Sequence, residues 1–185
     1  LKFGGNNFFT RTLLGLQFTI SHIAIIVAIA FYENARFQKK INLGFDKDGV
    51  IISNVSSGAE YESYRNALLQ NGNINLVAGA KNNFFMPTTT TITDGTKHVD
   101  VTSVDVGENY LETMGLVLLS GRDFNQNSKT DLQESVLVTR KLVERFGWGN
   151  PIGREILVND TTKVFVIGVI EDIYTSGLWR ELQPI

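Results

Sequence analysis

The feature that most constrains this chain is an uncharged apolar stretch near its start, residues 12–32 (TLLGLQFTISHIAIIVAIAFY). The stretch is 21 residues long and lies between Arg11 and Glu33. At about 1.5 Å per residue, a helix of this length spans about 30 Å, which is the thickness of a bilayer's hydrocarbon core. A signal peptide is the alternative, but its apolar region is usually shorter than this stretch. The sequence therefore predicts a retained transmembrane helix.

Four polar side chains interrupt this stretch. Gln17, Thr19 and Ser21 are uncharged, and they can hydrogen-bond either a neighbouring helix or their own backbone. His22 lies near the middle, where an ionisable group suggests a function because a charge is costly there. With no carboxylate beside it, we favour a neutral imidazole held within a helix bundle over a proton relay.

The charges that flank the stretch bear on its orientation. Lys2 and Arg11 precede it, whereas three basic residues follow it within segment 33–40. A count of positive charges would therefore place the following domain in the cytoplasm. The rule is calibrated on short loops, however, and more than 140 residues follow this helix.

Composition excludes several function classes. The net charge is −2 and no run of Lys or Arg could form a phosphate-binding stripe, so we expect no nucleic-acid partner. The chain has no cysteine and two histidines, which leaves little material for metal sites or nucleophilic catalysis. No Walker-type loop occurs, so any ATP hydrolysis must take place on another chain. We predict no catalytic, cofactor-binding or metal-binding residue, and no cofactor.

The rest of the chain predicts an α+β fold. A stalk leads from the membrane to Gly44, and residues 49–80 then alternate strand, helix and strand, with Ser57 and Glu60 forming a capping box. A single β-α-β unit cannot bury both faces of its sheet, so the sheet must be completed either later in the chain or beyond residue 185.

From residue 82 the pattern changes to short alternating segments typical of antiparallel sheet. We predict a hairpin turning at Asp94-Gly95, a short helix ended by Gly115, a helix capped by Thr139, and a second hairpin turning at Asn159-Asp160. The corresponding elements are strands 88–93, 96–106, 135–138, 155–158 and 163–170 and helices 110–114 and 139–146. We read 125–134 as a polar loop.

Residues 121–124 (GRDF) form a predicted turn that displays a charged pair, Arg122 and Asp123, anchored by Phe124. An anion site is the alternative. We favour the structural interpretation, because such local pairs are common at turns.

The order of seven short segments resembles the permeases of the MacB/FtsX-like ABC transporter family. The segments are 16–21 (LQFTIS), 42–48 (NLGFDKD), 104–115 with VD at its start and YLETMG at its end, 119–124 (LSGRDF), 150–154 (NPIGR), 166–172 (VIGVIED) and 183–184 (QP). Each segment alone is weak, whereas seven in this order are fairly specific. The resemblance marks thirteen residues with structural or coupling roles: Gln17, Phe18, Ser21, Leu43, Gly44, Phe45, Gly121, Arg122, Phe124, Pro151, Gly153, Gly168 and Asp172.

The resemblance also implies a domain plan, in which a porter-like subdomain of paired β-α-β units contains an inserted mixed α+β subdomain. On this plan the parts are a cytoplasmic flank (1–11), the transmembrane helix (12–32), a stalk (33–48), a first β-α-β unit (49–81), the inserted subdomain (82–178) and the start of the return to the porter-like subdomain (179–185). The second β-α-β unit would follow residue 185.

By this resemblance the chain is part of a permease in the bacterial inner membrane, with its main domain periplasmic. The permease would be a homodimer or pseudo-dimer that relays movement from a cytoplasmic ABC ATPase, with a periplasmic adaptor and outer-membrane channel as further partners. The alternative is the extracytoplasmic sensor domain of a membrane receptor or signalling kinase. An enzyme ranks third. The sequence does not name a transported substrate.

Overall fold

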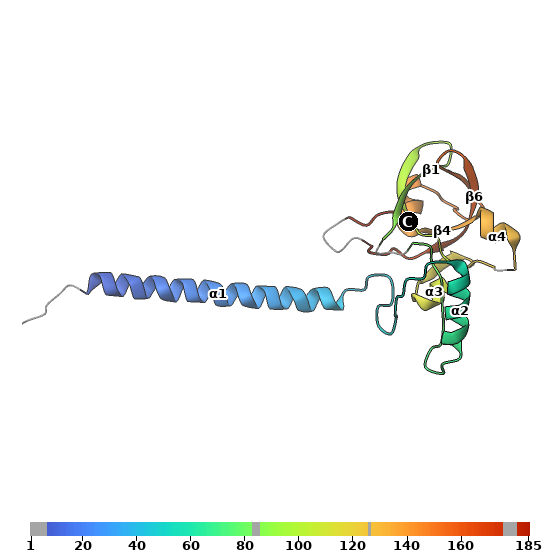
Figure 1. Cartoon of the computed structure of the whole chain (residues 1–185). Coiled ribbons are helices and arrows are strands. Elements are labelled where there is room, and N and C mark those ends of the chain that lie inside the picture. Colours follow the sequence, from blue (N-terminus) through green and yellow to red (C-terminus); the bar gives the residue numbers. More distant parts are fainter. Residues whose placement is uncertain (1–6, 83–85, 126, 176–180) are drawn as a thin grey trace, which may run out of the picture. The chain divides into compact units, whose positions relative to one another are not determined.

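The computed structural model describes residues 7–82, 86–125, 127–175 and 181–185. It divides the chain into two compact units, Leu1–Asn42 and Leu43–Ile185. Figure 1 shows the long helix α1 of the first unit, and the strands and shorter helices of the second.

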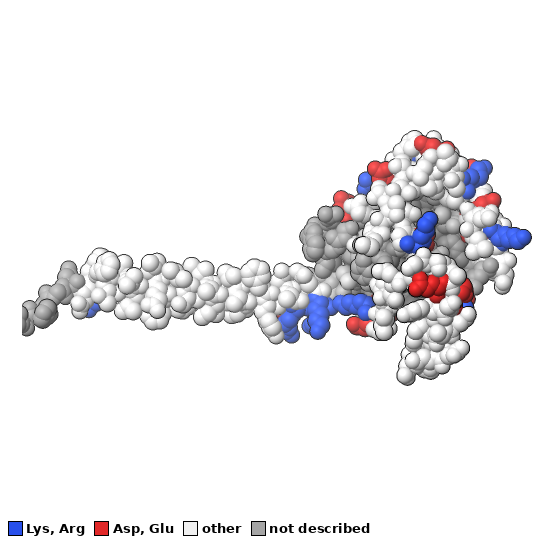
Figure 2. Space-filling view, in the orientation of Figure 1, with Lys and Arg blue, Asp and Glu red and all other residues white. Residues whose placement is uncertain are grey.

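The first unit is built on α1 (Phe8–Lys40), one unbroken helix of 33 residues. Its most apolar window has a mean hydropathy of 2.1, and among the described residues it is the one helix long and apolar enough to cross a membrane. Figure 2 shows a long surface without charge on α1, between basic side chains near its two ends. The helix continues past residue 32, as predicted for the stalk. It ends at Lys40, before Gly44, and Ile41 has an extended backbone.

Polar side chains within α1 bond to its own backbone. The Thr19 hydroxyl donates to the Gly15 carbonyl oxygen at 2.9 Å. The His22 Nδ1 atom lies 2.6 Å from the Phe18 carbonyl oxygen, one turn earlier. Of the two alternatives predicted for Thr19, the structure therefore shows back-bonding.

The second unit contains a six-stranded mixed sheet with the order β2-β1-β5-β6-β3, and β4 pairs in parallel with β6. The strands are β1 (Thr88–Thr93), β2 (His98–Ser103), β3 (Leu118–Gly121), β4 (Ser135–Thr139), β5 (Glu155–Val158) and β6 (Thr162–Ile170). Both predicted hairpins are present, β1 with β2 and β5 with β6. The second turns through residues 159–161, where Asn159 and Asp160 have left-handed φ angles of 51° and 58°.

Four helices accompany this sheet: α2 (Gly58–Leu69), α3 (Tyr110–Thr113), α4 (Lys129–Glu134) and α5 (Arg140–Phe146). The capping box that opens α2 is confirmed, because the Glu60 amide donates to Ser57 Oγ and Glu60 accepts from the Ser56 amide. Helix α4 lies where we predicted a loop. Its signal was local: the Asp131 amide donates to Ser128 Oγ at its first turn.

Two groups of buried side chains form the core of the second unit. The larger lies along the sheet and α5, with Val166 and Leu142 almost fully buried. The smaller gathers around α3 and the end of β6, and Phe45 packs against it. The segment that follows β6 therefore lies beside the segment that opens the unit.

The two strands predicted on either side of α2 are not present in the structure. Residues 50–55 pair with no described strand, and of the segment 74–80 only Ala80 forms an isolated bridge, to Val106. The β-branched pattern predicted strands, but a strand needs a neighbour to pair its backbone groups. Ile51 is 93% exposed, which shows how little covers the first segment.

The closing residues link two parts of the sheet. The Pro184 carbonyl oxygen accepts from the Thr102 amide in β2, and the Ile185 carbonyl oxygen accepts from the Thr139 amide at the end of β4, both at 2.9 Å. Pro184 is fully buried. Because residues 43–185 form one compact unit, the predicted division at residue 82 stays a prediction.

Candidate functional site: the junction around β6

Two glycines from the motif segments meet across the β3–β6 pair. Gly121 is the register partner of Gly168. A Cβ atom on Gly121 would lie 2.2 Å from the Ile167 carbonyl oxygen, and one on Gly168 would lie 2.7 Å from the Arg122 carbonyl oxygen. Both positions therefore require glycine for the close approach of the two backbones.

The turn that contains Pro151 is also attached to β6. The Gly153 amide donates to the Val166 carbonyl oxygen at 2.8 Å, and the Val166 amide donates to the Arg154 carbonyl oxygen at 2.9 Å. Gly153 has a φ angle of +79° and no atom within 4 Å of an added Cβ, so its backbone angle is what favours glycine.

The segment that opens the second unit is fastened beside the end of β6. The Tyr174 amide donates to the Leu43 carbonyl oxygen at 2.9 Å, and the Asp46 amide donates to the Met114 carbonyl oxygen at 2.8 Å. At Gly44, where φ is +84°, a Cβ atom would lie 2.3 Å from the Asp172 carbonyl oxygen. The two backbones are therefore too close for a side chain.

Asp172 joins this segment to α5. Its Oδ1 atom accepts from the Lys141 amide at 2.7 Å, in the first turn of the helix. Its Oδ2 atom lies 3.3 Å from Arg140 Nε, and Glu171 accepts from the same guanidinium at 3.4 Å. The hydrogen bond with Asp172 raises the pKa of Arg140. A carboxylate here also suits the positive end of a helix.

Thr139 does not cap α5 as predicted. It holds the N-cap position, but its side chain makes no capping hydrogen bond. Its hydroxyl instead accepts from the Ile185 amide at 3.0 Å and lies 3.3 Å from the Ile185 carbonyl oxygen. The closing segment takes up the Thr139 hydroxyl, so Thr139 does not cap α5. Asp172 instead accepts from a backbone amide in the first turn of α5.

We refer to the residues that hold these segments together, Gly44, Gly121, Gly168 and Asp172, as the β6 junction.

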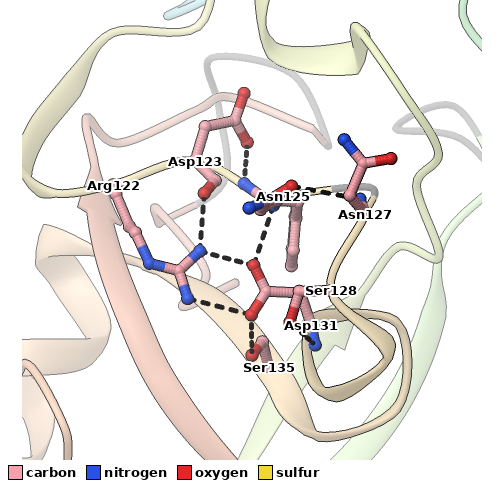
Figure 3. Close-up of polar contacts among 8 residues, drawn as sticks. Arg122, Asp123, Asn125, Asn127, Ser128, Asp131 and Ser135 are labelled. Carbon is pink, nitrogen blue, oxygen red and sulfur yellow. Dashed lines mark hydrogen bonds and ion pairs between the residues drawn. The ribbon is translucent and has the colours of Figure 1, made fainter.

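Arg122 has a different partner from the one predicted. Its guanidinium forms a two-pronged ion pair with Asp131 on α4, in which Nη2 lies 2.9 Å from Oδ1 and Nη1 contacts Oδ2 (Figure 3). Asp123 contributes only its backbone carbonyl to Arg122, at 3.0 Å. Its carboxylate accepts from the Phe124 amide at 2.7 Å, and Phe124 is half-buried. Asp123 was predicted as the partner of Arg122 because the two are adjacent in sequence. In the structure the chain reverses after β3, and Asp131 of α4 lies against the Arg122 guanidinium instead.

Asp131 is the buried centre of this network, with 4% of its side chain exposed. It also accepts from the Asn125 amide at 2.8 Å and from the Ser135 hydroxyl at 3.2 Å (Figure 3). The hydrogen bond from Arg122, followed by that from Asn125, holds the pKa of Asp131 well below its usual range. The same contact raises the pKa of Arg122. The network fastens the end of β3 to α4 and β4.

The motif residues thus fall into two sets. Those after residue 42 gather around β6, α5 and the Arg122–Asp131 pair, whereas Gln17, Phe18 and Ser21 lie on α1 in the other unit. Within the described ranges, no three His, Cys, Asp or Glu side chains are placed to hold a metal ion. The arrangement around β6 is suited to holding backbones in register.

Comparison with known proteins identifies the family. The profile of the MacB-like periplasmic core domain matches residues 10–180. The chain belongs to this family. A MacB-like domain of this kind is the periplasmic domain of a membrane permease, so the family overrides the charge count, which placed the domain in the cytoplasm.

The fold is similar to that of a solved MacB periplasmic region. The periplasmic region of MacB from Actinobacillus actinomycetemcomitans has a TM-score of 0.51 and 20% identity, with 75% of this chain and 65% of that chain covered. The extracellular domain of YknZ, an ABC-type transporter from Gram-positive bacteria, has a TM-score of 0.49 and 22% identity, with 59% of this chain and 56% of that chain covered. This chain therefore spans less than two thirds of either domain. No curated protein gives a significant match.

Proposed function

We propose that this chain is the membrane entry and much of the periplasmic domain of a permease in an ABC-type exporter or mechanotransmission complex. A partner ATPase in the cytoplasm moves the membrane helices, and the chain relays that movement to the periplasm. The β6 junction is the observation that carries this proposal. Because residue 43 follows the first unit directly, any displacement of α1 reaches the periplasmic domain first at a segment fastened to β6.

The contacts of this segment suit such a relay. Its backbone bonds to Tyr174 and Met114, and Gly44 allows it to lie against Asp172 without an intervening side chain. Asp172 in turn contacts the first turn of α5. A pull on Leu43 is therefore passed by backbone hydrogen bonds and close contact to the segment after β6, and from there to α5 through the short Asp172 side chain.

Coupling is tested with the full-length protein reconstituted with its ABC ATPase. We expect the two to co-purify and the permease to alter the rate of ATP hydrolysis. In Gly44→Val, the ATPase should still bind but its rate should respond less to the permease. Gly49→Val is the matched control, since Gly49 has a similar φ of +78° and nothing within 4 Å of an added Cβ.

Binding to no ABC ATPase would contradict the proposal and favour a sensor domain. Equal coupling in the two glycine variants, with both well folded by circular dichroism, would show that the close contact at Gly44 is not needed for the relay. A homodimer or pseudo-dimer, a periplasmic adaptor and an outer-membrane channel remain part of the proposal, and cross-linking in membranes tests them.

We also propose that residues 49–81 are one half of a porter-like subdomain whose other half lies outside residues 1–185. The support is the first segment, in which Ile51 is 93% and Ile52 53% exposed and residues 50–55 pair with no described strand. Hydrogen exchange on the full-length protein tests this. The amides of 50–55 should exchange slowly there and rapidly in the 185-residue chain. Rapid exchange in both would contradict it.

A further inference from the structure

The second unit contains a cavity of about 510 Å³, and parts of the motif segments 104–115, 119–124 and 166–172 contribute to its lining. Its walls come from both predicted hairpins and from β4, and they include Ile92, Val101, Val138 and Ile156. All four of these side chains are also buried in the main core. A cavity of this size with mostly apolar walls is in the range that accepts a small organic molecule.

The charged groups in the lining all have the same sign. Four carboxylates line the cavity, and none of its lining residues is Lys, Arg or His. Two of them are already neutralised, Glu108 by Arg65 at 3.2 Å and Asp131 by Arg122.

Asp105 and Asp123 are exposed, and neither forms an ion pair with a described residue. The cavity therefore offers apolar walls together with two carboxylates that form no ion pair within the part of the chain that the structure describes. Leu132, on α4, adds an apolar side chain that is 72% exposed and also belongs to the lining.

We propose that this cavity binds a small organic cation with a compact apolar body. The apolar body of the ligand covers the apolar walls and shields them from water, and its cationic group lies near Asp105 and Asp123. Anions of the same shape are disfavoured because the lining contains no positive charge to receive them. The site is separate from the β6 junction, so it does not depend on the relay proposed above.

The experiment uses two rigid probes of matched shape and opposite charge, 1-adamantyltrimethylammonium and adamantane-1-carboxylate. The 185-residue chain is placed in nanodiscs of neutral lipid. Since the chain has no cysteine, Leu132→Cys can carry a single environment-sensitive dye at the cavity. A second preparation carries the dye at Ile51→Cys, which is exposed and outside the lining, to report non-specific partitioning.

We expect the cation to change the signal of the dye at position 132 but not at position 51. It should bind about tenfold more tightly than the carboxylate, because two partly exposed charges each change affinity by a few-fold. The double variant Asp105→Asn/Asp123→Asn should lose most of this preference. Asp48→Asn, which removes an exposed carboxylate outside the lining, should keep it.

Three results would overturn the proposal. They are no binding of the cation at millimolar concentration, equal affinity for the two probes, and a preference for the cation that persists in the double variant. Circular dichroism of each variant shows that the fold is retained. A loss of binding in a folded double variant therefore reports the lost charges.

Discussion

At the scale of single residues, Gly44 and Gly49 have similar backbone angles but different surroundings. Their φ angles are +84° and +78°, yet an added Cβ touches the Asp172 backbone only at Gly44. Gly49→Ala should cost about 1–2 kcal/mol through the left-handed backbone alone. Gly44→Ala should cost about 1–3 kcal/mol more, because the two backbones must move apart.

Urea unfolding followed by tryptophan fluorescence measures both free energies. Equal losses of stability in the two variants would show that the close approach at Gly44 does not contribute.

The Arg122–Asp131 pair predicts a pH dependence. The pKa of Asp131 in the folded protein lies below its ordinary value of 3.8. The stability that this carboxylate contributes is therefore present above pH 3.8 and is lost as the pH falls through the folded-state pKa. Asp131→Asn should lower the urea midpoint clearly at pH 7, and its difference from the wild type should shrink below pH 3.8.

The same titrations of Asp48→Asn provide the control, since this exposed carboxylate has no ion pair among the described residues. A gap between wild type and Asp131→Asn that stays constant from pH 7 to pH 3 would contradict the assigned pKa direction.

At the scale of elements, the turn of the β5–β6 hairpin contains a backbone angle that glycine adopts more easily than aspartate. Asp160 adopts a φ of 58°, a left-handed angle at which glycine is the preferred residue. Asp160→Gly should therefore stabilise the protein by about 0.5–1 kcal/mol. The substitution also removes the contact with His98 at 3.0 Å, but that pair is more than half exposed and contributes little.

Thermal unfolding of Asp160→Gly and of His98→Ala separates the two effects. A lower midpoint for Asp160→Gly, together with an unchanged midpoint for His98→Ala, would show that the turn does not strain the aspartate.

Elements with local signals were the ones predicted correctly. Both hairpins, α3 and the capping box of α2 follow from turn residues and caps that lie within a few positions of each other. Helix α5 is also present, although its predicted Thr139 cap does not form. Helix α4 had such a signal at Ser128, and it was missed because the segment is polar. The segments beside α2 were predicted as strands and are not, because strand formation depends on a partner elsewhere in the chain.

At the scale of the whole molecule, the family and the charge count give opposite orientations for α1. The family places residues 43–185 in the periplasm. A cysteine at Ile51, which is 93% exposed, should therefore react with a membrane-impermeant maleimide in intact spheroplasts. A cysteine at Asn7, before α1, should react only after the membrane is permeabilised. The reverse pattern of labelling would contradict the assigned orientation.

The sequence alone determined the apolar helix, the α+β class, the two hairpins and the family, because these depend on local patterns or on the order of short motifs. Only the tertiary structure decided that Arg122 pairs with Asp131, that Ile185 takes the Thr139 hydroxyl, and that Gly44 lies against Asp172. The residues in these three contacts are 9, 46 and 128 positions apart in the chain. No local propensity encodes such pairs, since they form only when packing brings distant segments together.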